Sequence, residues 1–355
     1  MDEGGFVMYR SVAALLLASV LLFCGCSSAK PDQNLPEEAM TAVPSATAEP
    51  GKIRSSLLQE PYIIEASRSL SGIVETAGSL PHHMIEVSQS AELTADDITL
   101  DKVDNSADAL SGDALISGSE AMIYVDNASI SLSNSALSGT ALYSHALFLN
   151  AASGAMNNTI CVTTGSSQSA LFLSSSSMKL TDCRLVSTGS GAYSVYLQNS
   201  KLSCDMTDIS VEDSKDANSV YLQDSTVEFE DCEISGNLYY AGKSSIAFYG
   251  ADLTGDLFAD DSESDLEMTL FNCSKLKGCS YDDSAMGLCV SLDKSSTWEL
   301  TEDSFVARLT SADSSLSNII SNGYSLYYSS EHVGNEWLEG KTFSLPGGGF
   351  LIPLI

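Results

Sequence analysis

The chain has 355 residues, of which 47 are acidic and 16 are basic, so its formal net charge is −31 at pH 7. This balance argues against nucleic acid as a partner, because binding to a phosphate backbone needs clustered basic charge. It also disfavours a chain lying flat on anionic lipid, whereas neutral glycans, cationic proteins and divalent cations are not repelled.

The amino-terminal segment indicates export. Residues 12–23 form an unbroken run of apolar and small residues, too short to span a bilayer as a helix and typical of a signal-peptide core. The pair Gly25-Cys26 closes this run and resembles the lipobox of bacterial lipoproteins. That resemblance implies that residues 1–25 are a lipoprotein signal peptide and that Cys26 is the lipidated first residue of the mature chain. An ordinary secretory signal with an incidental cysteine is the alternative.

The next segment has the composition of a tether. Residues 26–52 are rich in proline, serine, alanine and glutamate and offer almost nothing to bury, which is typical of a disordered or semi-extended chain. We therefore expect the rest of the chain, residues 53–355, to be held off a bacterial cell membrane. The lipid anchor would be its membrane contact, with the chain exposed on the extracellular side.

A repeat dominates the middle of the chain. Five stretches of fifteen residues align without a gap, and their starts are 24, 24, 24 and 25 residues apart. A weaker sixth copy, "YYAGKSSIAFYGADL", begins at Tyr239, 19 residues after the fifth. The five aligned copies are "IYVDNASISLSNSAL" from Ile123, "LFLNAASGAMNNTIC" from Leu147, "LFLSSSSMKLTDCRL" from Leu171, "VYLQNSKLSCDMTDI" from Val195 and "VYLQDSTVEFEDCEI" from Val220.

Each unit alternates apolar and polar residues in short bursts, which predicts three short strands and no helix. Strands repeating every two dozen residues fit the coils of a parallel β-helix, stacked at roughly 4.8 Å. We therefore predict an all-β, right-handed parallel β-helix with coils of about 19–25 residues. A β-sandwich is the alternative, but it has no reason to keep this register. Residues 53–83 could form an amino-terminal cap, and the tail 347–355 could cap the other end with strands.

The twelfth position of each unit carries asparagine or aspartate, interrupted only by Met206. Such residues tolerate left-handed backbone and bond to nearby amides, so this column predicts a structural ladder at a sharp turn. Cys183 and Cys232 share the next column, two coils apart and so beyond disulfide reach. The predicted ladder consists of Asn134, Asn158, Asp182 and Asp231.

The second position of each unit is aromatic and should face outward, because its neighbours on the strand are apolar. Polar residues follow two positions later and include Gln198 and Gln223. An exposed aromatic stripe edged by amides is a candidate carbohydrate-binding platform. The alternative is that the rings stack on one another and stabilise the sheet. The candidate stripe consists of Tyr124, Phe148, Phe172, Tyr196, Tyr221 and Tyr240.

The stacked-coil pattern is similar to the right-handed parallel β-helix superfamily that includes pectate lyases and polygalacturonases. It looks more like the adhesin-like surface β-helix proteins of gut and anaerobic bacteria. The segments "HHMIEVSQSAELTADDITLDKVDNSADALSGDALISG" (82–118) and "VSLDKSSTWELTEDSFVARLTSADSSLSNIISNGYSLYY" (290–328) carry the second resemblance. It implies a surface-displayed interaction protein.

The sequence favours a non-catalytic binding or adhesion protein, with a polysaccharide or a surface protein as ligand. A lyase would need a basic residue beside calcium-holding carboxylates, and the aromatic-bearing strands hold one acidic residue, Asp126, in five units. A polysaccharide lyase or hydrolase therefore stands as the alternative, beside a structural spacer without a ligand. We expect no cofactor and no metal centre, although weak calcium binding to the acidic faces stays open.

Overall fold

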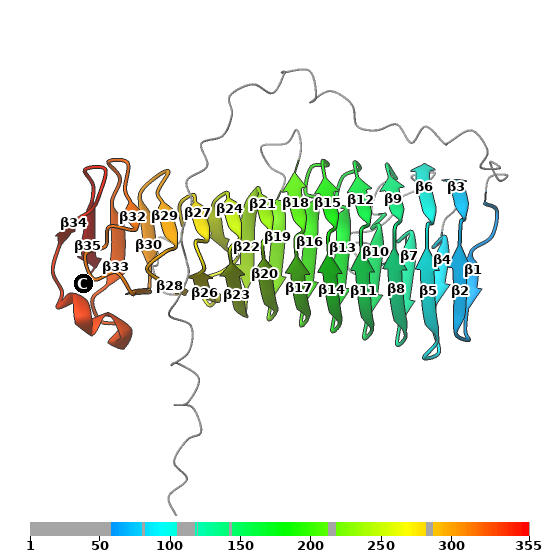
Figure 1. Cartoon of the computed structure of the whole chain (residues 1–355), viewed down its shortest axis with the longest axis horizontal. Coiled ribbons are helices and arrows are strands. Elements are labelled where there is room, and N and C mark those ends of the chain that lie inside the picture. Colours follow the sequence, from blue (N-terminus) through cyan, green and yellow to red (C-terminus); the bar gives the residue numbers. More distant parts are fainter. Residues whose placement is uncertain are drawn as a thin grey trace, which may run out of the picture. The chain divides into compact units, whose positions relative to one another are not determined.

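The computed structural model describes residues 58–79, 82–104, 118, 120–141, 144–211, 218–281 and 287–354. The chain divides into two units, Met1–Gly51 and Lys52–Ile355. The predicted signal peptide, Cys26 and the predicted tether lie outside the described residues. The second unit is an all-β parallel β-solenoid of the right-handed type with about 11 turns, as predicted (Figure 1).

Three long parallel sheets, named A, B and C, run along the solenoid; sheets B and C have 11 strands each, and sheet A has 9 and ends at β25. Sheet A collects the first strand of each repeat. Its strands in order are β1 (Tyr62–Ile64), β4 (Ile85–Val87), β7 (Ile123–Asp126), β10 (Leu147–Asn150), β13 (Ser169–Ser174), β16 (Tyr193–Gln198), β19 (Asn218–Gln223), β22 (Asn237–Ala241) and β25 (Leu257–Ala259).

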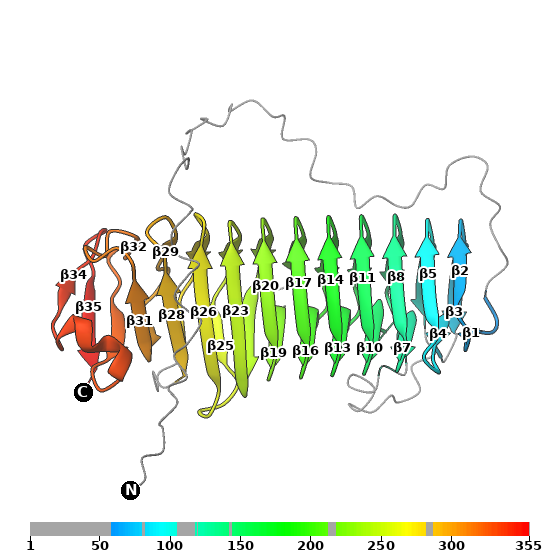
Figure 2. The same ribbon diagram turned by 60° about the horizontal axis from the view of Figure 1, so that its bottom comes forward.

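Sheet B collects the second strand of each repeat, and Figure 2 shows its strands side by side along the solenoid. They are β2 (Arg68–Ser71), β5 (Glu92–Asp96), β8 (Ser129–Ser133), β11 (Ser153–Asn157), β14 (Ser177–Thr181), β17 (Lys201–Asp205), β20 (Thr226–Glu230), β23 (Lys243–Tyr249), β26 (Asp265–Phe271), β28 (Leu288–Leu292) and β31 (Arg308–Ser311).

Sheet C completes each turn, so that the three sheets enclose one apolar core of inward side chains. Its strands are β3 (Val74–Ser79), β6 (Thr99–Asp104), β9 (Ala136–Gly139), β12 (Ile160–Thr163), β15 (Arg184–Ser187), β18 (Asp208–Val211), β21 (Glu233–Ser235), β24 (Asp252–Thr254), β27 (Lys275–Lys277), β29 (Thr297–Glu299) and β32 (Ile319–Ile320).

The strand register follows the sequence repeat through the five gapless copies. Ile123 pairs with Leu147, Leu147 with Leu171, and the series continues through Val195 to Val220. All five side chains are fully buried. The 24-residue period is therefore the length of one turn, and alternation along the strand decides which side chains enter the core.

On the inner side of the corner between sheets A and B, serine hydroxyls form a ladder of hydrogen bonds with backbone groups of successive turns. The Ser176 hydroxyl donates to the carbonyl of Ser174 at 2.7 Å and accepts from the amide of Ala152, one turn earlier, at 3.0 Å. Ser200 and Ser225 repeat both bonds on the next turns. Each buried amide at this corner thus finds a partner without water, as buried backbone groups require.

The corner between sheets B and C has the same design, and cysteines occupy part of its ladder. Ser135 and Thr159 donate to carbonyls two residues earlier, and the thiols of Cys183 and Cys232 do the same at 3.2 Å each. Burial raises the pKa of the Cys232 thiol to about 11. These cysteines therefore stand in for hydroxyl residues and stay protonated near neutral pH.

The outer side of this corner holds the predicted Asn/Asp column. Its backbone is left-handed throughout, with φ of 51° at Asn134, 45° at Asn158, 52° at Asp182 and 50° at Asp231. The amide of Asn158 donates to the side-chain oxygen of Asn134 at 2.8 Å, one turn away. Met206 adopts the same conformation with φ of 48°, although its side chain gains nothing there.

Replacing Met206 by asparagine should stabilise the solenoid by about 1 kcal/mol, because asparagine tolerates left-handed backbone better than other side chains with a Cβ. Met206 is 55% exposed, so the change removes little packing. The midpoint of urea unfolding should rise. As a control, Lys201→Asn adds asparagine at an exposed strand position, and it should not stabilise; equal effects of the two changes would contradict the explanation.

The carboxyl-terminal end is closed by a short fourth sheet and one helical turn. Sheet D orders β30 (Ser304–Val306), β33 (Leu326–Ser329), β35 (Phe350–Leu354) and β34 (Phe343–Ser344), and only the β34–β35 pair is antiparallel. The 3₁₀ helix η1 (Val333–Leu338) packs beside β31. The tail 347–355 thus supplies β35. Trp298 of β29, by contrast, is fully buried in the apolar core of the solenoid.

Candidate functional site

One aromatic side chain stands on the outer face of each turn from β7 to β33. In sheet A, strand pairing aligns Tyr124 of β7, Phe148 of β10, Phe172 of β13 and Tyr196 of β16 with Tyr221 of β19. We call this line of side chains the aromatic row. Its members in order are Tyr124, Phe148, Phe172, Tyr196, Tyr221, Tyr239, Phe258, Tyr281, Phe305 and Tyr327.

Phe148, Phe172 and Tyr221 in the first half of the aromatic row are buried, which corrects the prediction of an exposed stripe at these positions, whereas Tyr124 and Tyr196 are half-buried. Phe148 and Phe172 are 1% and 0% exposed and form a second small core with Ala121. The ring of His145 packs against both phenylalanines, at centroid distances of 5.5 Å and 5.1 Å. These two rings therefore lie on the outer face of sheet A, and other side chains shield them from solvent.

Connection length explains where the row is covered. Residues 140–146 join β9 to β10 and carry His145, and Ala121 of the second small core lies just before β7. Further along, Gly236 alone joins β21 to β22, and two residues join β24 to β25. A Cβ on Gly255 would lie 2.1 Å from the carbonyl oxygen of Gly236, so these tight connections stack backbone on backbone. Such connections cannot reach over the sheet, and the second half of the row stays open.

Tyr240 was assigned to the wrong column. It pairs with the inward Leu222 and is 1% exposed in the core, whereas Tyr239 pairs with Tyr221 in the row. The cause is a bulge at Ser219, where the register with β22 shifts from 19 to 18 residues. Between the pairs Gln223–Ala241 and Thr226–Ser245, the later turn has one residue more than the earlier turn. The spacing between paired residues is therefore 19 again at Thr226. A one-residue slip moves a side chain to the opposite face of its strand.

The sequence prediction missed the open half of the row, which comprises Tyr239, Phe258, Tyr281, Phe305 and Tyr327. Tyr281 is 44% exposed and the other four are half-buried. A local signal marks the first three: each follows a glycine by three residues, in "GNLY", "GDLF" and "GCSY". That signal is independent of the 24-residue period, which no longer holds in this part of the chain.

The rings stack face to face along the solenoid axis. Phe258 lies 4.7 Å from Tyr239 and 4.9 Å from Tyr281 between ring centroids, with interplanar angles of 12° and 15°. Phe305 and Tyr327 stack at 5.0 Å. A ring held between two others presents its edge to solvent, so the open half offers apolar edges and phenol hydroxyls, and the interior rings offer no free faces.

Two carboxylates bond to tyrosines of the row, one to Tyr221 next to the open half and one to Tyr281 within it. The hydroxyl of Tyr221 donates to Asp260 at 3.0 Å, and the hydroxyl of Tyr281 donates to Glu302 at 2.9 Å. Burial, with Tyr196 and Asp260 adding to it, raises the pKa of Tyr221. A hydrogen bond with Cys279, burial and Glu302 raise that of Tyr281. These phenols stay protonated near neutral pH, so they act as donors and not as bases.

The predicted amide side chains bond to each other. Gln198 donates to Gln223 at 3.3 Å on the neighbouring turn, and Asn150 donates to Asp126 at 2.7 Å in the same column. All four are half-buried, so their polar atoms are only partly available to a ligand.

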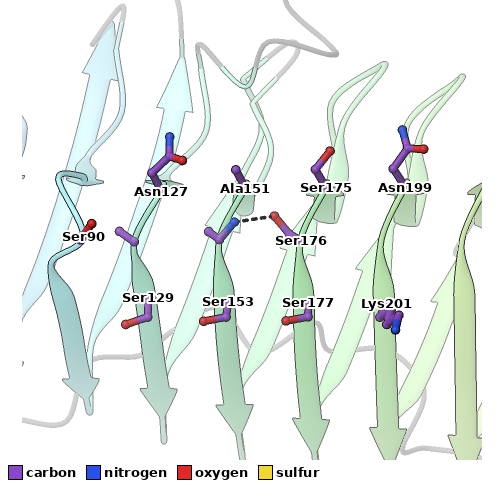
Figure 3. A pocket seen from close by; sticks show the side chains of 12 residues that line it. Ser90, Asn127, Ser129, Ala151, Ser153, Ser175, Ser176, Ser177, Asn199 and Lys201 are labelled. Carbon is purple, nitrogen blue, oxygen red and sulfur yellow. Dashed lines mark hydrogen bonds between the residues drawn. The ribbon is translucent and has the colours of Figure 1, made fainter.

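A groove of about 640 Å³ runs along the corner between sheets A and B (Figure 3). Small residues create it, because each turn contributes only serine, alanine or asparagine until Lys201 borders it. The sticks in Figure 3 show Ser129, Ser153 and Ser177 in one line across successive strands. The hydroxyl of Ser176, which lines the groove, already donates and accepts in the corner ladder. Part of the groove's hydrogen-bonding capacity is therefore used within the protein.

A buried ion pair lies beside the start of the row. The ammonium of Lys102 donates to Glu120 Oε2 at 3.0 Å and to the carbonyls of Glu120 and His82, and the two side chains are 0% and 5% exposed. His83 stacks on Tyr124 at 4.4 Å, and burial lowers its pKa to about 4. The ion pair joins β6 to Glu120 just before β7, and His83 packs on Tyr124, so we assign both features to structure.

Within the described ranges, no group of three or more histidine, cysteine, aspartate or glutamate side chains is placed to hold a metal ion. The same part of the chain has no helix with the length and apolar character needed to cross a bilayer.

The fold and the row define a parallel β-solenoid with a row of aromatic side chains along one outer face. No family model, curated protein or solved structure matches the chain.

Proposed function

We propose that this protein is an exported bacterial lipoprotein whose solenoid binds a polysaccharide at the cell surface without catalysis. The open half of the aromatic row carries this proposal. It supplies apolar ring edges and hydrogen-bonding groups on successive turns, and a polymer lying along the solenoid axis would meet one set of them per turn.

Two features favour binding over catalysis. The row tyrosines have raised pKa values, which suits hydroxyl donors and not general bases. The row is also an open surface, whereas catalysis draws on a site that excludes water. The resemblance to adhesin-like surface β-helix proteins adds to this proposal, as does the position of Cys26 after the apolar run.

The test displays the chain on a lipoprotein-exporting bacterium and measures capture of labelled polysaccharides of neutral, amino and uronic type. Cells should capture at least one of them. Phe258→Ala with Tyr281→Ala should abolish capture while the chain stays on the cells. Cys26→Ser should release the chain, and capture with it, because the lipid anchor is lost.

A matched control uses the ring pair Tyr249 and Phe271, which stack at 5.5 Å on the outer face of sheet B. Tyr249→Ala with Phe271→Ala should leave capture unchanged, and urea unfolding should show both double variants folded. Capture of no polysaccharide, or equal loss in the two double variants, would sink the proposal.

A further inference from the structure

The open half of the aromatic row lies in a strongly acidic part of the molecule. Between Gly250 and Ser274 the chain has seven acidic residues and no basic one, although two of them, Asp252 and Glu267, pair with Lys275 and Arg308. Asp260 and Glu302 are both exposed and each accepts a phenol hydroxyl from the row. Among the described residues, neither of these carboxylates forms an ion pair. Their charges are therefore directed at solvent beside the ring edges.

We propose that the ligand of this surface is a polysaccharide that carries free amino groups. The inference rests on the proposed function and names the chemical class of its ligand. An ammonium group on each sugar can pair with the carboxylates, while the sugar's apolar edge lies against the ring edges. A uronic acid polymer meets the same carboxylates with like charge and is repelled.

The spacing of the row favours a sugar polymer over a basic protein segment. Successive rings lie 4.7 and 4.9 Å apart, which is the separation of neighbouring strands. A pyranose unit advances its polymer by a comparable distance, and in a β-1,4-linked polymer every second sugar presents the same face, so alternate sugars can meet alternate rings in the same orientation. An extended peptide repeats its same-face side chains every ~6.8 Å and falls out of step with the row after a few residues.

The tyrosine hydroxyls contribute to the same selectivity. Because each carboxylate already accepts a phenol hydroxyl, its orientation is fixed and one oxygen remains for the ligand. Tyr281 and Glu302 therefore form one positioned pair, and Tyr221 and Asp260 form another. Phe148 and Phe172 offer no equivalent opening, because His145 and Ala121 pack against them.

The experiment measures binding of the mature chain with Cys26→Ser to three sugar oligomers of equal length. They are a glucosamine oligomer, its fully N-acetylated form and a galacturonate oligomer, with polylysine as a fourth probe. We expect the glucosamine oligomer to bind roughly tenfold more tightly than the acetylated one at low salt, and the difference to shrink as salt screens the charges. Galacturonate should not bind.

Asp260→Asn with Glu302→Gln tests the carboxylates, because the amide oxygens can still accept both phenol hydroxyls. This variant should bind the two glucosamine forms equally. Asp205→Asn with Glu230→Gln removes the same charge from neighbouring turns of sheet B and should leave the preference intact.

Equal binding of the two forms by the unaltered chain overturns the inference, and if Phe258→Ala with Tyr281→Ala still abolishes binding, the proposed function stands. Tighter binding of polylysine than of the glucosamine oligomer also overturns it and assigns the surface to basic polypeptides. Binding of no sugar oligomer overturns both proposals.

Discussion

Replacing Lys102 by alanine should lower the free energy of unfolding by ~3–5 kcal/mol, because it leaves the Glu120 carboxylate buried without its partner. The two side chains are 0% and 5% exposed, and the ammonium also satisfies two carbonyl oxygens. Urea unfolding followed by circular dichroism measures the change. Hydrogen exchange should show the loss concentrated around β6 and β7, because Lys102 lies on β6 and Glu120 lies just before β7.

The matched variant is Lys102→Met with Glu120→Leu, which replaces both charges by apolar side chains of similar length. Breaking one half of a buried pair is costly, whereas replacing both halves is often close to neutral. The double variant should therefore regain most of the stability that Lys102→Ala loses. A single variant as stable as the unaltered chain would show that the pair is not desolvated in solution.

Phe172→Ala should cost ~3–5 kcal/mol, the range for a large aromatic side chain removed from a packed core. Phe172 stacks at 4.5 Å on Phe148 and at 4.4 Å on Tyr196, and its ring also meets His145. The expected loss of stability arises because Phe172 is packed in the second small core, although it lies outside the interior of the solenoid. Thermal unfolding and urea unfolding should agree on its size.

Phe258→Ala provides the comparison, since Phe258 occupies the same column but is only half-buried. Its replacement should cost less than about 2 kcal/mol. If both phenylalanines proved equally dispensable, the loops would not cover the first half of the row in solution, and the proposed division between structure and binding would fail.

Much of the architecture follows from the sequence because strand periodicity and turn length are local properties. Alternation identifies inward residues such as Val125 and Leu149, and the constant 24-residue spacing predicts that they stack. The Asn/Asp column could be read in the same way, since left-handed corners restrict the side chains they accept. The ladder of Ser176 and Ser200 was not predicted, although serine recurs at that position in the aligned copies.

The row was harder to predict for two physical reasons. Outward orientation does not imply exposure: Phe148 faces away from the core and is still buried, because Gly118, Ala121 and His145 lie against its ring. A bulge at Ser219 also changes the register by one residue, and no residue type demands a bulge there. Beyond it, a search tied to one period cannot follow the column to Phe258.

The two corner ladders have a consequence for how such a chain changes over generations. Each ladder joins a turn only to its immediate neighbours, and the pattern of donors and acceptors is the same from one turn to the next. A duplicated or deleted stretch leaves every amide partnered if it begins and ends at equivalent corners, whereas one that is out of phase breaks both ladders. Whole turns are thus the heritable unit, and the rod can lengthen or shorten in steps of one turn without a redesign of its interior.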